Sequence, residues 1–478
     1  MSSLTNKASD PRLLVASVGA SIVLAWGYFA LGPLPVVVLL ILPWLVVFFY
    51  KLPLLLTLLW PAAFFYDETI HDTLSNVFPI LAHVGSVLLL PLDIPYFFTI
   101  AYLSICVFAQ PRKLRHVASE YPFLIVFLIL VVISVVVYTP YFGKMAIGEA
   151  RKSYFCFLFP ILALSSIKTV ADLHRLLAAA VVLALGVSLI GYLLLFTQPS
   201  VRTDFRAISA GGALILLFAT FAVVIAHSNG VVIIRRHLDN LMVFSFLPLI
   251  FMTHHRTVFL AATIGVVLLY AMHANRMVFM LKAVVLGTIC LTAVYIIFVT
   301  NARFERLFLT ALAGILQPSS DETGAWRLAA WREQLFTLSE SQWLFGKGLG
   351  SYYDWYYGLE HIQVGPHDGY VQIVLKLGLV GLLVYALFAV RFFRQMFLAR
   401  KTLSRGPYRA YIEIGLVNVA AAHALMTGYD IPLIVLIYYA IGMVSRDIAL
   451  GLENATPMQI ATNACTSARR FELRRSVQ

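Results

Sequence analysis

The chain has 478 residues, of which 61% are hydrophobic and 12% are charged, with a mean hydropathy of +0.87. Soluble globular proteins are about 45–50% apolar and about 25% charged, so this composition excludes a chain of ordinary soluble domains. The 35 Lys and Arg residues outnumber the 23 Asp and Glu residues, which gives a net charge of +12. In a membrane protein the positive-inside bias accounts for such an excess. We therefore expect a membrane protein with no nucleic-acid partner.

A membrane-spanning helix needs about 20 mostly apolar residues, and the chain contains about 12–14 such runs. The sequence therefore predicts an all-α integral membrane protein. Pro91, Asp93 and Pro95 interrupt the stretch 76–109, so we expect one crossing there with a re-entrant or interfacial half. The expected spans are 12–31, 33–50, 52–66, 76–109, 121–139, 153–167, 173–196, 208–227, 239–252, 257–273, 279–299, 368–390, 409–427 and 431–449.

The distribution of positive charge predicts the orientation of these spans. With the N-terminus in the cytoplasm, most of the Lys and Arg residues fall in inside connections, as the positive-inside rule requires. The C-terminus is then cytoplasmic too. We divide the chain into an N-terminal transmembrane bundle (1–299), one large outside loop (300–366), C-terminal transmembrane helices (367–449) and a basic inside tail (450–478).

The outside loop 300–366 is rich in Trp and Tyr. These residues fit either an aromatic belt at the membrane interface or a platform on which sugar rings stack. Residues 326–333 predict a helix with Arg327 and Trp331 one turn apart. In the turn 344–350 that follows, Gly346 and Gly348 allow the backbone to approach a ligand closely.

A polar stripe begins where this loop enters the next apolar helix. His367 precedes Asp368, Gln372 and Lys376, which lie at i, i+4 and i+8 on one helix face. A charge near the bilayer centre costs about 2.5–3.5 kcal/mol, so we expect this face to point into the bundle rather than toward lipid.

Several basic residues fall outside, against the positive-inside bias, and we expect them to converge at the outer leaflet with His367. Guanidinium groups bind phosphate bidentately, and a histidine with a pKa near 6.5 can accept a proton from a hydroxyl. The pattern predicts a site for a phosphate-rich lipid head, although each arginine alone also fits a simple headgroup contact. The candidate arginines are Arg151, Arg202, Arg206, Arg256 and Arg327.

Taken in order, these elements resemble the superfamily of O-antigen ligases and O-antigen polymerases, over about residues 200–390. No single element is specific, but the order and the side of the membrane agree. The matching elements are Arg206, Arg256-Thr257, Arg327 with Trp331, Leu344-Phe345-Gly346-x-Gly348-x-Gly350, His367-Asp368-x-Tyr370 and Leu377-Gly378-Leu379-x-Gly381.

The resemblance implies a multi-pass glycosyltransferase of the bacterial inner membrane, with its active site facing the periplasm. The implied donor is a glycan on undecaprenyl diphosphate. The acceptor is lipid A-core for a ligase or another glycan repeat for a polymerase, and both remain open. No metal and no cofactor are implied. The resemblance assigns the diphosphate to Arg206, Arg256 and Arg327, with Arg202 and Arg151 beside them, the base to His367, and sugar or loop contacts to Trp331, Gly346, Gly348 and Tyr370.

The sequence departs from the family pattern at two positions. Asp368 follows the histidine where the family usually has Asn or Ser, so this carboxylate either raises the pKa of His367 or is itself the base. Lys376 stands where the family often has an acidic residue. Lys376 and the broken stretch 76–109 also leave a second hypothesis open, a transporter or flippase of a lipid-linked glycan.

Overall fold

The computed structural model describes residues 33–67, 82–84, 87–89, 92–197, 208–253, 255–273, 322–357, 360–363 and 365–453, together with the single positions 277, 288 and 292. Helices dominate this part of the chain, and its strands form two short antiparallel hairpins. The predicted fold class, an all-α integral membrane protein, is confirmed. The expected spans 12–31 and 279–299 and most of the inside tail lie outside the described residues.

The elements of the first half are α2 (Pro33–Lys51), α3 (Pro53–Phe65), β1 (Ala82–Val84), β2 (Val87–Leu89), α5 (Asp93–Ala109), α6 (Pro111–Glu120), α7 (Pro122–Phe142), α8 (Lys144–Glu149), the π-helical turn η3 (Ala150–Tyr154), the 3-10 turn η4 (Phe155–Phe157), α9 (Leu158–Ser166) and α10 (Val170–Thr197). Those of the second half are α12 (Ala210–Ser228), α13 (Arg236–Met252), α14 (Arg256–Met272), α17 (Glu322–Phe336), α18 (Glu340–Phe345), β3 (Asp354–Tyr357), β4 (Glu360–Gln363), α19 (Gly369–Thr402), α20 (Pro407–Leu425) and α21 (Val435–Glu453).

Among the described residues, four helices are long and apolar enough to cross a membrane, namely α7, α10, α12 and α19. The number rises to six if each of two bent pairs counts as one span. One pair joins Leu42–Lys51 to α3 at 105°, and the other joins α5 to α6 at 109°. Pro53 and Pro111 begin the second helix of each pair, because a proline at the first helical position lacks only an N–H that would have no partner within the helix.

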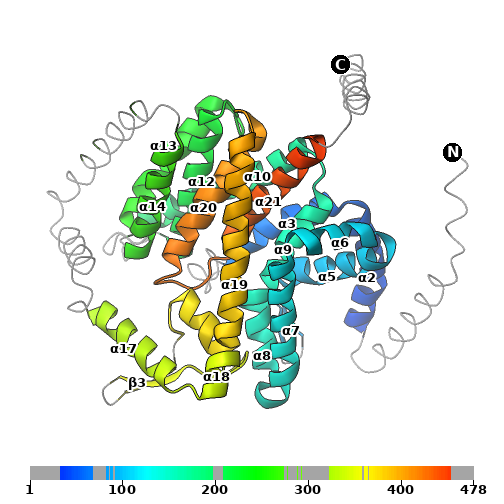
Figure 1. Cartoon of the computed structure of the whole chain (residues 1–478), viewed down its shortest axis with the longest axis vertical. Coiled ribbons are helices and arrows are strands. Elements are labelled where there is room, and N and C mark those ends of the chain that lie inside the picture. Colours follow the sequence, from blue (N-terminus) through cyan, green and yellow to red (C-terminus); the bar gives the residue numbers. More distant parts are fainter. Residues whose placement is uncertain are drawn as a thin grey trace, which may run out of the picture.

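Two of the long helices differ in how much of their apolar surface is buried inside the bundle. In α12, 89% of the spanning window is buried, and the helix packs against α10, α13, α14 and α20 (Figure 1). In α7 only 28% of the window is buried, and large side chains such as Val136 and Tyr141 point outward. An α-helix that is apolar on every side belongs in a core or in lipid. We conclude that α12 forms the centre of the bundle, while α7 faces the bilayer.

The 34-residue helix α19 connects the two ends of the bundle. Its N-terminal end lies beside α17 and α18, and we call this the loop end (Figure 1). Gly378 has a φ of 70° and breaks the helical geometry of α19. A Cβ on Gly378 would lie 2.1 Å from the carbonyl oxygen of Leu344, so only glycine allows α18 to end against this kink.

Candidate functional site

The face of α17 that carries Arg327 and Trp331 is fixed to two other segments of the loop end. Arg327 Nη1 donates a hydrogen bond to the carbonyl oxygen of Gly428 at 3.1 Å. The indole Nε1 of Trp331 donates to the carbonyl oxygen of Pro366, directly before His367. The predicted helix with these residues one turn apart is therefore confirmed, and both side chains anchor it near the start of α19.

His367 has an unusual backbone conformation at the point where the loop meets α19. Its φ is 50°, which makes it the one non-glycine residue with a positive φ among the described residues. Such left-handed conformations cost energy in most residues and occur frequently at functional sites. The half-buried ring of His367 lies 6.2 Å, centroid to centroid, from the ring of Trp326 on α17. The structure therefore holds the imidazole between α17 and α19.

Asp368 caps the N-terminus of α19. Its Oδ1 accepts hydrogen bonds from the backbone N–H groups of Tyr370 at 2.9 Å and Val371 at 2.8 Å. The residue is only 5% exposed, and burial raises the pKa of its carboxyl above the usual 3.8, helped by the negative charge of Asp430. The two backbone donors oppose this rise because they stabilise the carboxylate. This carboxylate therefore has a structural role as an N-cap.

The turn 426–434 between α20 and α21 joins α14, α17 and α19 at the loop end. The N–H of Gly369 donates to the carbonyl oxygens of both Met426 and Tyr429 at 2.9 Å. A Cβ on Gly428 would lie 2.7 Å from Thr257 Cγ2 and 3.8 Å from Arg327 Nη1. Because Thr257 follows Arg256 in the first turn of α14, the structure brings the start of α14 and Arg327 to the same turn.

Of the three remaining candidate arginines, the structure describes only Arg151. Arg202 and Arg206 lie outside the described residues. Arg151 lies in η3, where its Nη1 is 2.9 Å from Asp93 Oδ2, and both side chains are mostly buried. The Asp93 carboxylate already balances the charge of Arg151, so a phosphate there would share this guanidinium with Asp93.

The stripe of Asp368, Gln372 and Lys376 is buried, as the sequence predicts, with exposures of 5%, 8% and 1%. Lys376 has a partner that its position in the sequence does not predict. Its Nζ is 2.9 Å from Glu149 Oε2 on α8, and it lies 4.0 Å from the centre of the Tyr353 ring. The sequence does offer one clue, because Glu149 is an acidic residue in a connection that we expect to lie on the same side of the membrane as the loop 300–366.

Glu149 also binds the loop that follows α18. It accepts a hydrogen bond from the N–H of Gly350 at 2.7 Å and another from Tyr353 Oη at 3.1 Å. Burial and the carboxylate of Glu149 raise the pKa of Tyr353 well above 10.0, so its hydroxyl stays protonated and donates. Glu149, Lys376 and Tyr353 therefore tie residues 350–353 to both α8 and α19.

The glycine-rich turn 344–350 approaches the protein's own backbone and side chains. Gly346 and Gly348 have φ values of 81° and 88°, which favour glycine. A Cβ on Gly346 would lie 2.4 Å from the carbonyl carbon of Lys376, and one on Gly348 would lie 2.2 Å from the ring of Tyr138 on α7. The two glycines are therefore needed where the turn packs against α19 and α7, and their predicted contact with a ligand stays a prediction.

Tyr370 points into the bundle. Its Oη is 2.8 Å from Nδ1 of His423 on α20, and it also donates to the His423 carbonyl oxygen at 3.1 Å. The other ring nitrogen of His423 lies 2.7 Å from Tyr439 Oη. This hydrogen-bonded chain connects the first turn of α19 to α20 and α21.

Three buried side chains near this region have polar atoms without a hydrogen-bond partner in the described part of the chain. They are both amide atoms of Gln334 on α17, Oε1 of Gln372 on α19 and the hydroxyl of Tyr154 in η3. Gln334 is 2% exposed and follows Arg327 and Trp331 at i+7 and i+3, so the three share one helix face. Buried polar groups are normally paired, so these unpaired atoms are exceptions in the described part of the chain.

Residues 241–386 match the protein-family model described as O-antigen ligase. The predicted resemblance to the superfamily of O-antigen ligases and polymerases is thereby confirmed. The matched segment contains Arg256, Arg327 and His367, whereas Arg151 and Glu149 lie before it. The match supports a function of the O-antigen ligase or polymerase type in general. No curated protein sequence matches the chain.

Within the described residues, no group of three His, Cys, Asp or Glu side chains is arranged to hold a metal ion. The residues gathered at the loop end have a different chemistry. Arg256 and Arg327 supply positively charged guanidinium groups, and His367 supplies an imidazole, whose ring nitrogens can donate or accept a hydrogen bond. These residue types can bind a phosphate and accept a proton.

Proposed function

We propose that the protein transfers a glycan from undecaprenyl diphosphate to an acceptor hydroxyl at the periplasmic face of the bacterial inner membrane. In this proposal Arg256 and Arg327 bind the diphosphate, with Arg206, Arg202 and Arg151 contributing from neighbouring segments. His367 is the base. The division into a bundle (1–299), a periplasmic loop (300–366), C-terminal helices (367–449) and a cytoplasmic tail (450–478) is part of the same proposal.

One observation carries the proposal. The segment that matches the O-antigen ligase family contains Arg256, Arg327 and His367, and the turn at Gly428 brings their helices together at one end of the bundle. The three residues lie far apart in sequence, so the fold has to assemble them. The left-handed backbone of His367 adds to this argument, because such conformations persist where the surrounding structure enforces them.

In the reaction, the acceptor hydroxyl oxygen attacks the anomeric carbon of the donor glycan. His367 accepts the hydroxyl proton, so the attacking oxygen gains negative charge as the new glycosidic bond forms. The bond between the anomeric carbon and the diphosphate oxygen breaks, and undecaprenyl diphosphate leaves with the electron pair. In this proposal the positive charges of Arg256 and Arg327 stabilise the charge developing on this leaving group.

Gln334 and Gln372 extend the proposal to the sugar. An amide offers both donors and an acceptor, and sugar hydroxyls offer the complementary groups. Gln334 shares the α17 face with Arg327 and Trp331, and Gln372 lies one turn after Asp368 on α19. We assign these amides to hydroxyls of the glycan or of the acceptor. Of the two hypotheses for the aromatic residues of this loop, the proposal favours the platform on which sugar rings stack, with Trp331 as a member.

The alternative of a transporter or flippase loses the support it drew from Lys376. The charge of Lys376 is balanced by Glu149, and the pair holds the loop after α18 in place. A buried lysine with a structural partner needs no moving substrate to explain it.

The proposal is tested in a strain that lacks the chromosomal copy and expresses His367→Ala or Arg256→Ala from a plasmid. We expect both variants to insert into the membrane and to abolish the long surface polysaccharide. Arg332→Ala, an exposed arginine of α17, is the matched control and is expected to keep it. Wild-type polysaccharide from either site variant would overturn the assignment of these residues.

The pattern of the residual lipopolysaccharide separates the two activities. Loss of a polymerase leaves single repeats on the core, since ligation still proceeds. Loss of a ligase leaves bare core, and the polymer accumulates on the carrier lipid.

A further inference from the structure

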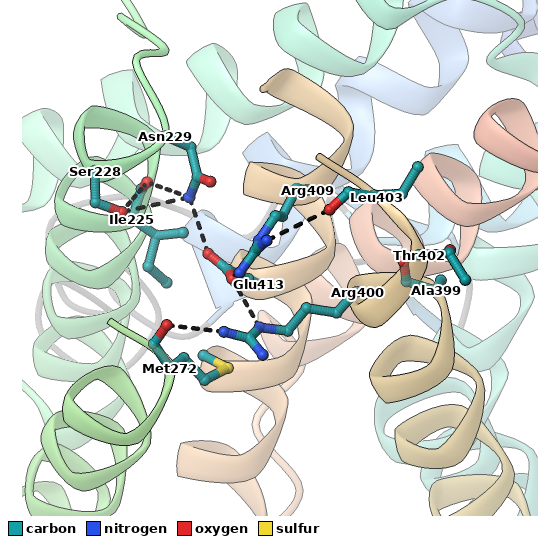
Figure 2. A network of polar contacts seen from close by, with 10 residues as sticks. All are labelled: Ile225, Ser228, Asn229, Met272, Ala399, Arg400, Thr402, Leu403, Arg409 and Glu413. Atoms are coloured by element: carbon teal, nitrogen blue, oxygen red, sulfur yellow. Dashed lines mark hydrogen bonds and ion pairs between the residues drawn. The ribbon is translucent and has the colours of Figure 1, made fainter. Parts of the chain in front are cut away.

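A second polar centre lies at the opposite end of the bundle, near the C-terminal ends of α12, α14 and α19 (Figure 2). Glu413 of α20 accepts hydrogen bonds from Arg400 at 2.7 Å, from Arg409 at 3.1 Å and from Asn229 at 2.9 Å. Arg400 also donates to the carbonyl oxygen of Met272 at the end of α14. Two guanidinium groups therefore share a single carboxylate, and the network keeps a positive charge.

A small cavity, partly open to the outside, lies beside this network, between the C-terminal ends of α12 and α14 and the start of α20. Arg405, in the connection between α19 and α20, lines it and adds a further exposed positive charge. Polar and apolar residues both contribute to its walls. The lining residues are Ile225, Ser228, Asn229, Leu269, Met272, His273, Arg405, Arg409 and Glu413.

The walls of this cavity indicate the chemistry of its ligand. Arginines bind phosphate well, because the guanidinium plane can donate two parallel hydrogen bonds to two phosphate oxygens. Ile225, Leu269 and Met272 give the same cavity an apolar wall, which a free inorganic anion would not use. An amphiphile with an anionic phosphate head and acyl chains matches both parts.

We propose that this cavity binds the phosphate headgroup of an anionic membrane lipid. The headgroup contacts Arg405 and Arg409, and the acyl chains lie against Leu269 and Met272. The orientation expected from the sequence puts this end in the cytoplasmic leaflet, where anionic lipids concentrate and basic pockets between helices bind their headgroups. The site is separated from the loop end by the length of α19, so it does not depend on the proposed glycosyl transfer.

The experiment measures lipid binding to the full-length protein in detergent by native mass spectrometry. The probes are dilauroyl phosphatidylglycerol, dilauroyl phosphatidylcholine and inorganic phosphate. Arg405→Gln removes a cavity charge, and Lys401→Gln removes an exposed charge that lies near the same helix end and does not line the cavity. Ser228→Trp fills the cavity from an exposed position of α12 without removing a charge.

We expect wild type and Lys401→Gln to bind phosphatidylglycerol more tightly than phosphatidylcholine. Arg405→Gln should weaken phosphatidylglycerol binding about five-fold, the factor equivalent to ~1 kcal/mol per basic residue near an anionic surface. Ser228→Trp should weaken it at least as much. Equal losses in Arg405→Gln and Lys401→Gln would overturn the site in favour of unspecific charge attraction. If the protein binds inorganic phosphate as tightly as phosphatidylglycerol, the cavity does not select a lipid, and the proposal is overturned.

Discussion

The ion pair of Lys376 and Glu149 permits a quantitative test of how the loop after α18 is held. Lys376 is 1% exposed, and its Nζ lies 2.9 Å from the carboxylate. At an effective dielectric constant of ~20, Coulomb's law gives about 6 kcal/mol of attraction at this distance. Desolvation offsets much of it, and breaking a buried pair by removing one partner costs about 3–5 kcal/mol. Glu149 keeps its bonds from Gly350 and Tyr353, so we expect the lower end, about 3 kcal/mol, for Lys376→Met.

The assay is a double-mutant cycle read by denaturant unfolding in mixed micelles. Lys376→Met and Glu149→Gln each leave one charge buried without its partner, whereas the double variant leaves none. We expect the double variant to recover most of the lost free energy of unfolding, because neither charge then remains buried. Lys401→Met, an exposed lysine of the same helix, is the control and should change stability by less than about 0.5 kcal/mol. A double variant as unstable as the sum of the two single variants would refute the reasoning.

Three further predictions follow from the loop end. Asp368→Ala should lower the free energy of unfolding by about 1 kcal/mol, because the N-cap of α19 is lost. Asp368→Asn retains a capping oxygen and should keep both stability and polysaccharide synthesis. An inactive, well-folded Asp368→Asn variant would instead identify this carboxylate as the base. Because burial raises the pKa of Asp368, the folded state binds more protons than the unfolded one above pH 3.8, so stability should fall as the pH rises through the raised pKa. Unfolding measured from pH 4 upward should show this slope in wild type, and the same slope in Asp368→Asn would contradict it. Gly348→Ala should destabilise the protein by more than about 1 kcal/mol, since the φ of Gly348 is 88° and the new Cβ would meet the ring of Tyr138. An unchanged unfolding midpoint would contradict this and show that the turn relaxes away from α7.

Much of the helical framework follows from local sequence. The runs 121–139, 173–196 and 208–227 correspond closely to α7, α10 and α12, because a long apolar run forms a helix whatever its neighbours. The bend before Pro53 could not be predicted from the sequence. Two apolar runs on either side of a short break predict two crossings, while their relative angle depends on the packing of the whole bundle.

In the candidate site, features set by local sequence could be predicted, whereas contacts between distant segments could not. The periodicity of Asp368, Gln372 and Lys376 predicts a buried face, because helical spacing alone determines which residues share a side. The partner of Lys376 could not be predicted in this way, since Glu149 lies on α8, far away in the sequence. The pairing of Arg151 with Asp93 could not be predicted either, because these two residues also lie far apart in the sequence. Asp368 as an N-cap had a local signal, because an Asp directly before a helix is a typical cap.

The proposed glycosyl transfer is measured directly with purified protein reconstituted in liposomes that contain a radiolabelled glycan on undecaprenyl diphosphate. Two acceptors, lipid A-core and a second lipid-linked repeat, are supplied separately, and formation of the glycosidic bond is measured. We predict transfer to one of them by wild type and by Arg332→Ala. His367→Ala and Arg256→Ala should lower the rate at least about 100-fold, the scale of losing a general base or an electrostatic contact to the leaving group. Comparable transfer by wild type and His367→Ala, or movement of the labelled lipid across the bilayer without any new glycosidic bond, would contradict the account.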